Sequence, residues 1–389
     1  RNFVFITCSV VVALSNVFYF SFLPYNKHKM WDGIFFNQNL ISEKPKIVLL
    51  SSYTSSTMWG NTSKKKEALS GSKLSASYLQ MLELKACYAY KHGYDFVFNT
   101  TNGIDPKLSD PSGSRWWLSY GGWVRVPQIS SIISKYDWVL YDDIDHVFLN
   151  HSFAVEELLD QWKQYKKSPS VLVPSDNHRY PFSDYALLMK NSLFSKRVLE
   201  YWLKFSLGIC ENGNFAAEKR SYKWEDSDQP GIWYGLMQAH KEVYHPSALN
   251  DNICNQSTGL LKSRMQDRGR APEMQEYFSR QNTPKGCSGK DLEKIPHDQP
   301  ILWSQRNSEI HPYGGLGYNA KYGRGPETEH RIARAWAAHI PAKDLSLPFI
   351  KNILNGCRKT QKCFAEYAGN GSLQVGCGGK LYHGTQLFF

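Results

Sequence analysis

The chain has 389 residues and a formal net charge of +11, with 42% hydrophobic and 14% aromatic residues. A chain of this length can bury a large core, so we expect one large domain, alone or with extensions. The positive charge does not indicate a nucleic-acid-binding protein, because the basic residues form short clusters such as 64–66 and no nucleic-acid motif accompanies them. The aromatic content suits surfaces that stack on carbohydrate or nucleotide rings, and equally an aromatic core.

Residues 3–23 form an almost uninterrupted apolar run that stops at Pro24. The run matches the roughly 20 residues that a transmembrane helix needs. A cleaved signal peptide is the alternative, since residues 13–15 would suit a signal peptidase. Because the run continues beyond them to Leu23, which is too long for the apolar core of a signal peptide, we favour an uncleaved transmembrane signal anchor at 3–23 and a polar stem at 24–45.

Five N-glycosylation sequons follow the anchor, at Asn61, Asn99, Asn150, Asn255 and Asn370. One sequon is weak evidence, but five after an anchor predict a lumenal domain. We therefore expect the replacement of Asn99 or Asn255 to remove glycan mass. The predicted topology is that of a single-pass type II protein of the Golgi or endoplasmic reticulum membrane.

Eight cysteines point to the same oxidising compartment. One lies in the anchor and Cys87 lies in a predicted helix, while six lie in the second half of the chain: Cys210, Cys254, Cys287, Cys357, Cys363 and Cys377. A Cys-x-x-Cys pair is absent, which argues against a zinc site. We expect disulfides among the last six cysteines.

From residue 46 onward, apolar strands alternate with amphipathic helices. Strands are predicted at 46–52, 94–98, 138–141, 171–174, 185–189 and 301–303, and helices at 77–93, 122–135, 152–167 (with Ser152 as the N-cap), 191–205 and from 225. The order of strand, helix and strand gives right-handed parallel units, so the fold class is α/β. Regularity fades beyond Tyr244, and residues 346–389 are interpreted as a Cys- and Gly-rich extension after a domain at 46–345.

An acidic cluster follows the third predicted strand, where Asp142, Asp143 and Asp145 come in quick succession. The carboxyl end of a buried strand is the usual place of a ligand site in an open α/β sheet. Asp143 and Asp145 are two positions apart, so an extended backbone points both the same way. Two such carboxylates suit a hard divalent cation that also holds phosphate oxygens, whereas the alternative is a polar turn without a ligand.

Short motifs in a fixed order carry a resemblance to a known family. They are Lys85 with Tyr88-Ala-x-x-His-Gly-Tyr94, Trp123-x-Arg125-x-Pro127, Trp138-Val-Leu-Tyr-x-Asp143-x-Asp145, Leu187-Leu-Met-Lys-Asn191 and Asp228-Gln229. Over roughly residues 46–245 the chain resembles the GT-A-fold nucleotide-sugar glycosyltransferases, in particular the galactomannan α-galactosyltransferase, xyloglucan α-xylosyltransferase and yeast mannosyltransferase group. The resemblance implies a Rossmann-like, mainly parallel sheet flanked by helices.

The resemblance also implies a donor site. Asp143 and Asp145 match the DxD motif, which contacts the donor's ribose and, through Mn²⁺ or Mg²⁺, its diphosphate. Arg125 matches a position where relatives carry Lys near the donor, so it is a predicted donor-binding residue. The pair Asp228 and Gln229 matches an Asp-Gln pair near the sugar, and is the predicted catalytic pair.

Folds of this kind take a third metal ligand from a late histidine. His339 is the predicted ligand, with His311 and His383 behind it, and a histidine that caps an apolar helix is the alternative reading of His339. Three departures weaken the carry-over: Asp142 is an additional acid, residues 182–186 lack an Asn-x-Gly, and no match extends beyond about residue 250.

The implied activity is metal-dependent transfer of a hexose or pentose from a nucleotide-diphosphate sugar to a glycan or glycoprotein acceptor, with retention giving an α-linkage. The implied partners are donor, acceptor and membrane, and the resemblance leaves open a homo-oligomer or a hetero-oligomer with other glycosyltransferases. The main alternative is a non-catalytic lumenal glycan-binding protein with the same fold. A glycosidase ranks last, because Asp143 and Asp145 lie side by side and do not flank a sugar bond.

Overall fold

A computed structural model describes residues 44–52, 74–99, 124–164, 170–174, 184–207, 301–304, 318–319, 335–340, 342–369 and 372–382, with a few further residues at 231–242, 332–333 and 384. Residues 45–389 form one compact unit. The predicted anchor at 3–23 lies outside the described residues, as does the predicted stem up to residue 43. Among the helices that the structure describes, none is both long and apolar enough to span a membrane.

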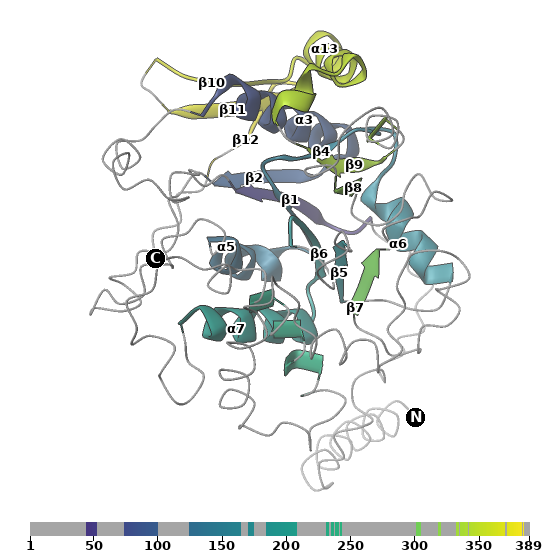
Figure 1. Ribbon diagram of the computed structural model, residues 1–389, viewed down its shortest axis with the longest axis vertical. Coiled ribbons are helices and arrows are strands. Elements are labelled where there is room, and N and C mark those ends of the chain that lie inside the picture. Colours follow the sequence, from purple (N-terminus) through teal and green to yellow (C-terminus); the bar gives the residue numbers. More distant parts are fainter. Residues whose placement is uncertain are drawn as a thin grey trace, which may run out of the picture. The chain divides into compact units, whose positions relative to one another are not determined.

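A six-stranded sheet with the order β2-β1-β3-β6-β5-β7 forms the centre of this unit (Figure 1). Its strands are β1 (Ile47–Ser52), β2 (Asp95–Asn99), β3 (Trp138–Asp143), β5 (Val171–Pro174), β6 (Ala186–Lys190) and β7 (Ile301–Ser304). β1 pairs in parallel with β2 and β3, and β5 pairs in parallel with β7, whereas β6 runs against both of its neighbours. The predicted α/β class with a mainly parallel sheet is therefore confirmed.

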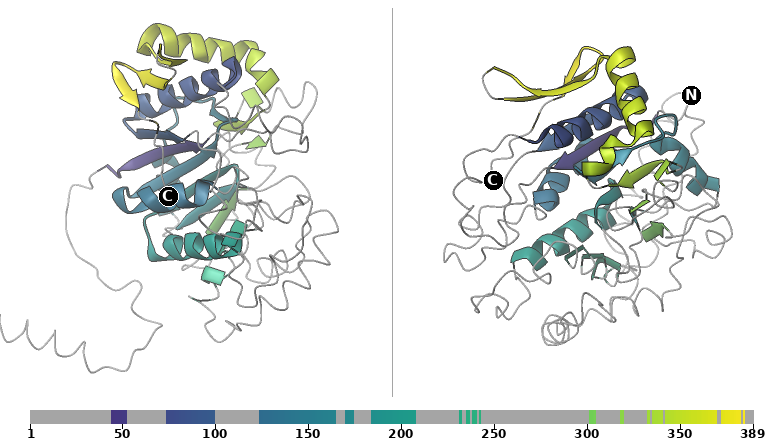
Figure 2. Two further views of the ribbon diagram at one scale, coloured as in Figure 1. Left: turned by 90° about the vertical axis from the view of Figure 1, so that its left-hand side faces the viewer. Right: turned by 45° about the horizontal axis from the view of Figure 1, so that its top comes forward.

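Helices cover both faces of the sheet (Figures 1 and 2). They are α3 (Ala76–His92), α5 (Arg125–Ile132, continued by the 3₁₀ turn η5 at Ile133–Lys135), α6 (Val155–Gln164) and α7 (Leu193–Leu207). α3 connects β1 to β2 on one side of β1, and α5 precedes β3 on the other side. Because such crossovers are right-handed, α3 and α5 must lie on opposite faces. α3 ends at Gly93, whose φ of 75° is left-handed and favours glycine.

The predicted start of α6 is wrong by two residues. Ser152 does not cap the helix, because its hydroxyl and its backbone N–H both donate to the side-chain oxygen of Asn150. The helix begins at Val155. The N–H of Ala154 donates instead to Glu157 Oε1 at 2.9 Å, which satisfies a backbone donor that the first turn leaves without a helical partner.

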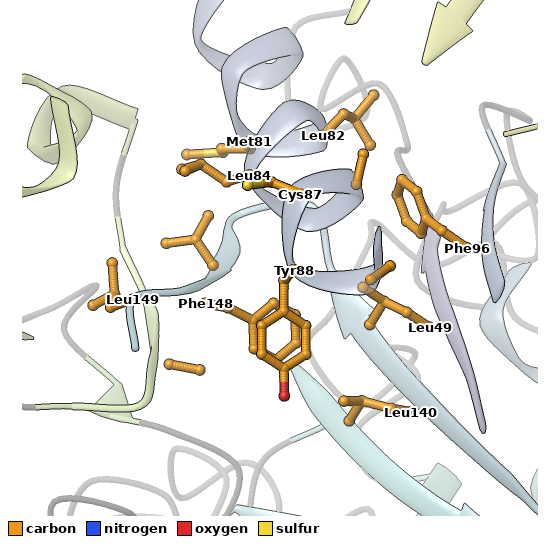
Figure 3. Packing of buried hydrophobic residues seen from close by; sticks show 14 of the residues in the cluster. Leu49, Met81, Leu82, Leu84, Cys87, Tyr88, Phe96, Leu140, Phe148 and Leu149 are labelled. Carbon is orange, nitrogen blue, oxygen red and sulfur yellow. The ribbon is translucent and has the colours of Figure 1, made fainter. Parts of the chain in front are cut away.

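The core is centred on Tyr88, which projects from α3 toward the sheet (Figure 3). Its ring stacks on Phe148, with centroids 4.0 Å apart and an interplanar angle of 8°. The Tyr88 hydroxyl group donates to the carbonyl oxygen of Phe153 at 2.9 Å, so the buried polar end is satisfied. The strand β4 (His146–Phe148), which follows the acidic turn, is thereby packed directly against α3.

The C-terminal segment forms a further layer over α3 (Figures 1 and 2). It consists of the 3₁₀ turn η8 (Ala342–Ser346), α13 (Pro348–Gln361) and an antiparallel sheet of β10 (Phe364–Tyr367), β11 (Leu373–Cys377) and β12 (Lys380–Tyr382). The sequence did not indicate these elements. They cover the outer side of α3, which explains why every residue from Met81 to Ala89 is buried.

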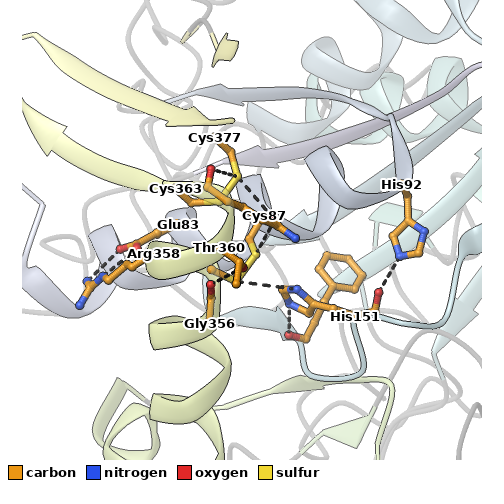
Figure 4. The surroundings of a disulfide bond; sticks show 12 residues. Glu83, Cys87, His92, His151, Gly356, Arg358, Thr360, Cys363 and Cys377 are labelled. Carbon is orange, nitrogen blue, oxygen red and sulfur yellow. Dashed lines mark hydrogen bonds and ion pairs between the residues drawn. A yellow bond between two sulfur atoms is a disulfide. The ribbon is translucent and has the colours of Figure 1, made fainter. Parts of the chain in front are cut away.

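Covalent and ionic bonds attach this layer to α3 (Figure 4). Cys87 of α3 is disulfide-bonded to Cys357 of α13, and Cys363 is bonded to Cys377. The first pair corrects the expectation that disulfides join only the last six cysteines, whereas the second pair agrees with it. Arg358 of α13 also donates to both carboxylate oxygens of Glu83, at 2.7 and 2.8 Å.

A separate three-stranded sheet has the order β4-β9-β8, with β8 at Tyr318–Asn319 and β9 at Ala337–His339. β4 and β9 are antiparallel, and His146 lies opposite His339. The alternative reading of His339 as the cap of an apolar helix is therefore wrong, because the residue lies on a buried strand. This pairing brings a late segment of the chain next to the acidic turn.

The two disulfides are expected to differ in their contribution to stability. In the chain-entropy model, a bond that closes a loop of 270 residues stabilises by about 6 kcal/mol, and one that closes 14 residues by about 3 kcal/mol. The double variant Cys87→Ala/Cys357→Ala should therefore lower the free energy of unfolding more than Cys363→Ala/Cys377→Ala. Urea unfolding of both variants measures the difference, and an equal loss would contradict the loop-length argument.

Candidate active site

Asp143, Asp145 and His339 converge at the carboxyl end of β3. Their nearest ligand atoms all lie within 4.8 Å of one another. The side chains of Asp143 and Asp145 are 25% and 19% exposed, and that of His339 is 7% exposed. Asp143 is the last residue of β3, and Asp145 lies in the turn between β3 and β4. The β4–β9 pairing supplies the histidine.

His339 and Asp145 fix each other's position. His339 Nε2 lies 2.9 Å from Asp145 Oδ1. The histidine ring stacks on Tyr185, with centroids 4.8 Å apart and an interplanar angle of 16°. The backbone N–H of Ile340 donates to the carbonyl oxygen of Asp145 at 2.9 Å. The turn is thus attached to β9 through both its side chain and its backbone.

Asp143 is held from the other side by Arg125. Arg125 Nη2 lies 3.0 Å from Asp143 Oδ1, and Arg125 Nη1 lies 3.0 Å from a carboxylate oxygen of Asp184. Nη1 also donates to the carbonyl oxygen of Asp184 at 2.6 Å. The guanidinium group lies over the ring of Tyr141, 5.1 Å from its centroid, and the Tyr141 hydroxyl group donates to Asp143 at 3.0 Å. Arg125 therefore joins α5 to the acidic turn.

Asp142, the acid without an assigned role in the sequence, forms a buried ion pair with Lys85 of α3. Both side chains are 0% exposed. His146 Nδ1 lies 3.6 Å from the same carboxylate oxygen. Burial lowers the pKa of the Lys85 ammonium group, and the nearby charge of Asp142 opposes this shift. Asp142 points into the protein and belongs to the support of the site.

Most of the predicted donor and metal residues come together here. Arg125, Asp143, Asp145 and His339 lie in one connected group. The predicted catalytic pair 228–229 lies outside the described residues, as do the two reserve histidines at positions 311 and 383.

Sequence reasoning missed three supporting side chains. Asp184 has no role in the sequence-based prediction, whereas in the structure it binds Arg125. Tyr141 was assigned to an apolar strand, and Lys85 was noted as part of a motif without a function. Lys85 carried a detectable signal, because a lysine surrounded by buried positions of a helix needs an acidic partner.

The side chains at this site fit a divalent cation. Two carboxylates and an imidazole are ligands of the kind that Mn²⁺ takes, and Mg²⁺ shares the preference for carboxylate oxygen. Side chains that hydrogen-bond to these ligands and orient them are also present, since Arg125 and the Tyr141 hydroxyl group both contact Asp143.

Comparison with known proteins identifies the chain. Residues 57–282, more than half of it, match the model of the galactosyl transferase GMA12/MNN10 family. The chain belongs to this family. It is accordingly a glycosyltransferase, as the sequence motifs predicted. A search of curated proteins finds no match.

Among solved structures, the chain is similar to a glycosyltransferase involved in the glycosylation of the major capsid of PBCV-1, with 12% identity, a TM-score of 0.28, and coverage of 52% of this chain and 75% of that one. It is also similar to the glycosyltransferase GlyE of Streptococcus pneumoniae, with 13% identity, a TM-score of 0.30, and coverage of 81% and 64%.

Replacement of Arg125 should reveal its buried bridging role. Arg125→Met leaves Asp143 and Asp184 without their shared cation, so the free energy of unfolding should fall by about 3 kcal/mol. Arg197→Met is the control, because its ion pair with Glu200 is about 40% exposed and should contribute less than about 1 kcal/mol. Thermal and urea unfolding report both values. Equal losses of unfolding free energy in the two variants would contradict the bridging role of Arg125.

Proposed function

We propose that this glycosyltransferase is metal-dependent and transfers a hexose or pentose from a nucleotide-diphosphate sugar to a glycan or glycoprotein acceptor. The observation that supports the metal is the convergence of Asp143, Asp145 and His339 within 4.8 Å. Family membership supports the nucleotide-sugar donor and the glycan acceptor. Mn²⁺ or Mg²⁺ is the proposed cation, held by these three side chains.

Contacts between side chains of the site would hold the proposed metal ligands in place for the diphosphate of the donor. When bound, the cation supplies Lewis-acid stabilisation of the charge that develops on the leaving nucleoside diphosphate. Arg125 keeps the Asp143 carboxylate in place, and His339 does the same for Asp145. In this proposal the two contacts hold Asp143 and Asp145 in position for the cation, which limits the reorganisation needed when the donor binds.

Transfer with retention, which gives an α-glycoside, is proposed from the resemblance of the motifs to retaining enzymes. The proposed catalytic pair is 228–229, near the sugar. In this proposal the acceptor oxygen attacks the anomeric carbon from the face that the nucleoside diphosphate leaves. A new carbon–oxygen bond replaces the bond to the phosphate oxygen, and the hydroxyl proton passes to the departing diphosphate.

The proposed location is the Golgi or endoplasmic reticulum membrane, with residues 3–23 as a signal anchor and the catalytic domain in the lumen. The two disulfides support an oxidising compartment. Assembly with copies of itself or with other glycosyltransferases is an extension of the same proposal.

Transfer by the purified chain, measured with a panel of nucleotide sugars, should require Mn²⁺ or Mg²⁺ and stop with a chelator. Asp145→Asn should lower kcat/KM at least about a hundredfold with little change in Tm, because it removes a ligand charge at a partly exposed position. Asp160→Asn, at an exposed position on α6, should leave transfer unchanged. Full activity of Asp145→Asn, or transfer that persists with the chelator, would contradict the proposed metal site.

N-glycosylation tests the lumenal location. Asn150 is partly exposed at the surface, so Asn150→Gln should remove one glycan from the chain expressed in a secretory host. Asn99 is only 1% exposed, which corrects its prediction as a glycan site, because a folded chain has no space for a glycan there. Asn99→Gln should therefore leave the glycan mass unchanged. A chain without glycan at Asn150, as judged by glycosidase treatment and gel mobility, would count against the proposed location.

A further inference from the structure

The Lys85 ammonium group uses all of its donors at one place. It contacts the Asp142 carboxylate, the carbonyl oxygen of Asp143 at 2.8 Å and the carbonyl oxygen of His146 at 2.5 Å. An ammonium group has three N–H donors, and here three oxygen atoms surround it. The side chain is 0% exposed, so it has no access to a donor sugar or an acceptor.

The two carbonyl groups mark the ends of the acidic turn. β3 ends at Asp143 and β4 begins at His146, so a single ammonium group joins the last residue of one strand to the first residue of the next. Asp145 lies between them. The direction in which its carboxylate points depends on the backbone of this turn, and so does its contact with His339.

α3 provides a rigid base for this ammonium group. Tyr88, one helical turn from Lys85, stacks on Phe148 of β4. Cys87, two residues from Lys85, is bonded to α13. A lysine on such a base can hold two carbonyl oxygens at a fixed separation. Neutralising Asp142 requires only the contact of Lys85 with its carboxylate, so the two carbonyl contacts serve a further purpose.

We propose that Lys85 is a positioning residue of the metal site, which acts through the Asp143–His146 turn to align the two carboxylates with His339. The inference rests on the proposed metal dependence. Lys85 touches neither donor nor cation, and its effect is transmitted by the carbonyl groups at the two ends of the turn. Residues that hold metal ligands in place without binding the metal commonly change the metal affinity by about tenfold to a hundredfold.

The test is the affinity of the full chain for Mn²⁺ alone, measured from the EPR signal of the free ion. The variant Lys85→Met/Asp142→Asn removes both charges of the pair, so no unpaired buried charge remains. We expect its Kd for Mn²⁺ to rise about tenfold to a hundredfold while cooperative unfolding is retained. Lys91→Met, an exposed lysine on the same helix, should leave the Kd unchanged.

A second variant, Asp142→Asn alone, removes the counter-charge of Lys85 but keeps an amide oxygen and the two carbonyl oxygens around the ammonium group. Where this variant unfolds cooperatively, its Kd for Mn²⁺ should change far less than that of the double variant. A loss of affinity in Asp142→Asn as large as the expected tenfold would overturn the inference even if the double variant does not fold. A folded double variant that binds Mn²⁺ like the wild type would also overturn it. If the wild type itself binds no Mn²⁺, the proposed metal dependence fails first, and this outcome is distinct from the other two.

Discussion

The burial of an ammonium group is the constraint on which the arrangement of the site depends. A buried charge is strongly unfavourable unless polar atoms replace its water, and Lys85 meets this requirement with oxygen atoms of the acidic turn. The requirement fixes where α3 lies along β3, since a shift of one residue along the helix would turn Lys85 away from Asp142. Stacking of Tyr88 on Phe148 favours the same position of α3. Electrostatics and aromatic packing therefore specify one register between helix and turn.

Each acid of the turn has a partner from a different part of the chain. Asp142 pairs with α3, Asp143 with α5, and Asp145 with β9. Three negative charges on four consecutive residues would repel one another strongly in a dry environment. Lys85 and Arg125 counter this repulsion, and His339 contacts the third carboxylate. The acidic turn is consequently stable in the folded protein, and three separate segments converge to make it so.

The central fold was predictable because its signals are local. The strand that ends in Asp143 and the helix that ends before Gly93 follow from apolar periodicity and from the glycine that ends the helix. The extended backbone expected across the Asp143–Asp145 pair is not found, because Asp145 lies in the turn between β3 and β4. The rest of the fold and of the site depends on contacts between segments that are far apart in the sequence. His339 lies on a strand because β4 provides its partner, nearly two hundred positions earlier in the sequence. α3 looked amphipathic, and no local pattern showed that residues 348–382 would cover its outer side. The bond between Cys87 and Cys357 has the same origin, and so does the role of Asp142.

The separation of Cys87 and Cys357 has a consequence for biosynthesis. The two cysteines are 270 positions apart, so their bond cannot form until residue 357 has been synthesised, long after α3. In the folded protein Cys363 and Cys377 lie close to the same Gln361 side chain as Cys87, so the four cysteines of two disulfides are neighbours. Correct pairing therefore requires a choice among neighbouring sulfur atoms. A variant truncated before α13 would leave Cys87 without its partner Cys357 and open to mispairing.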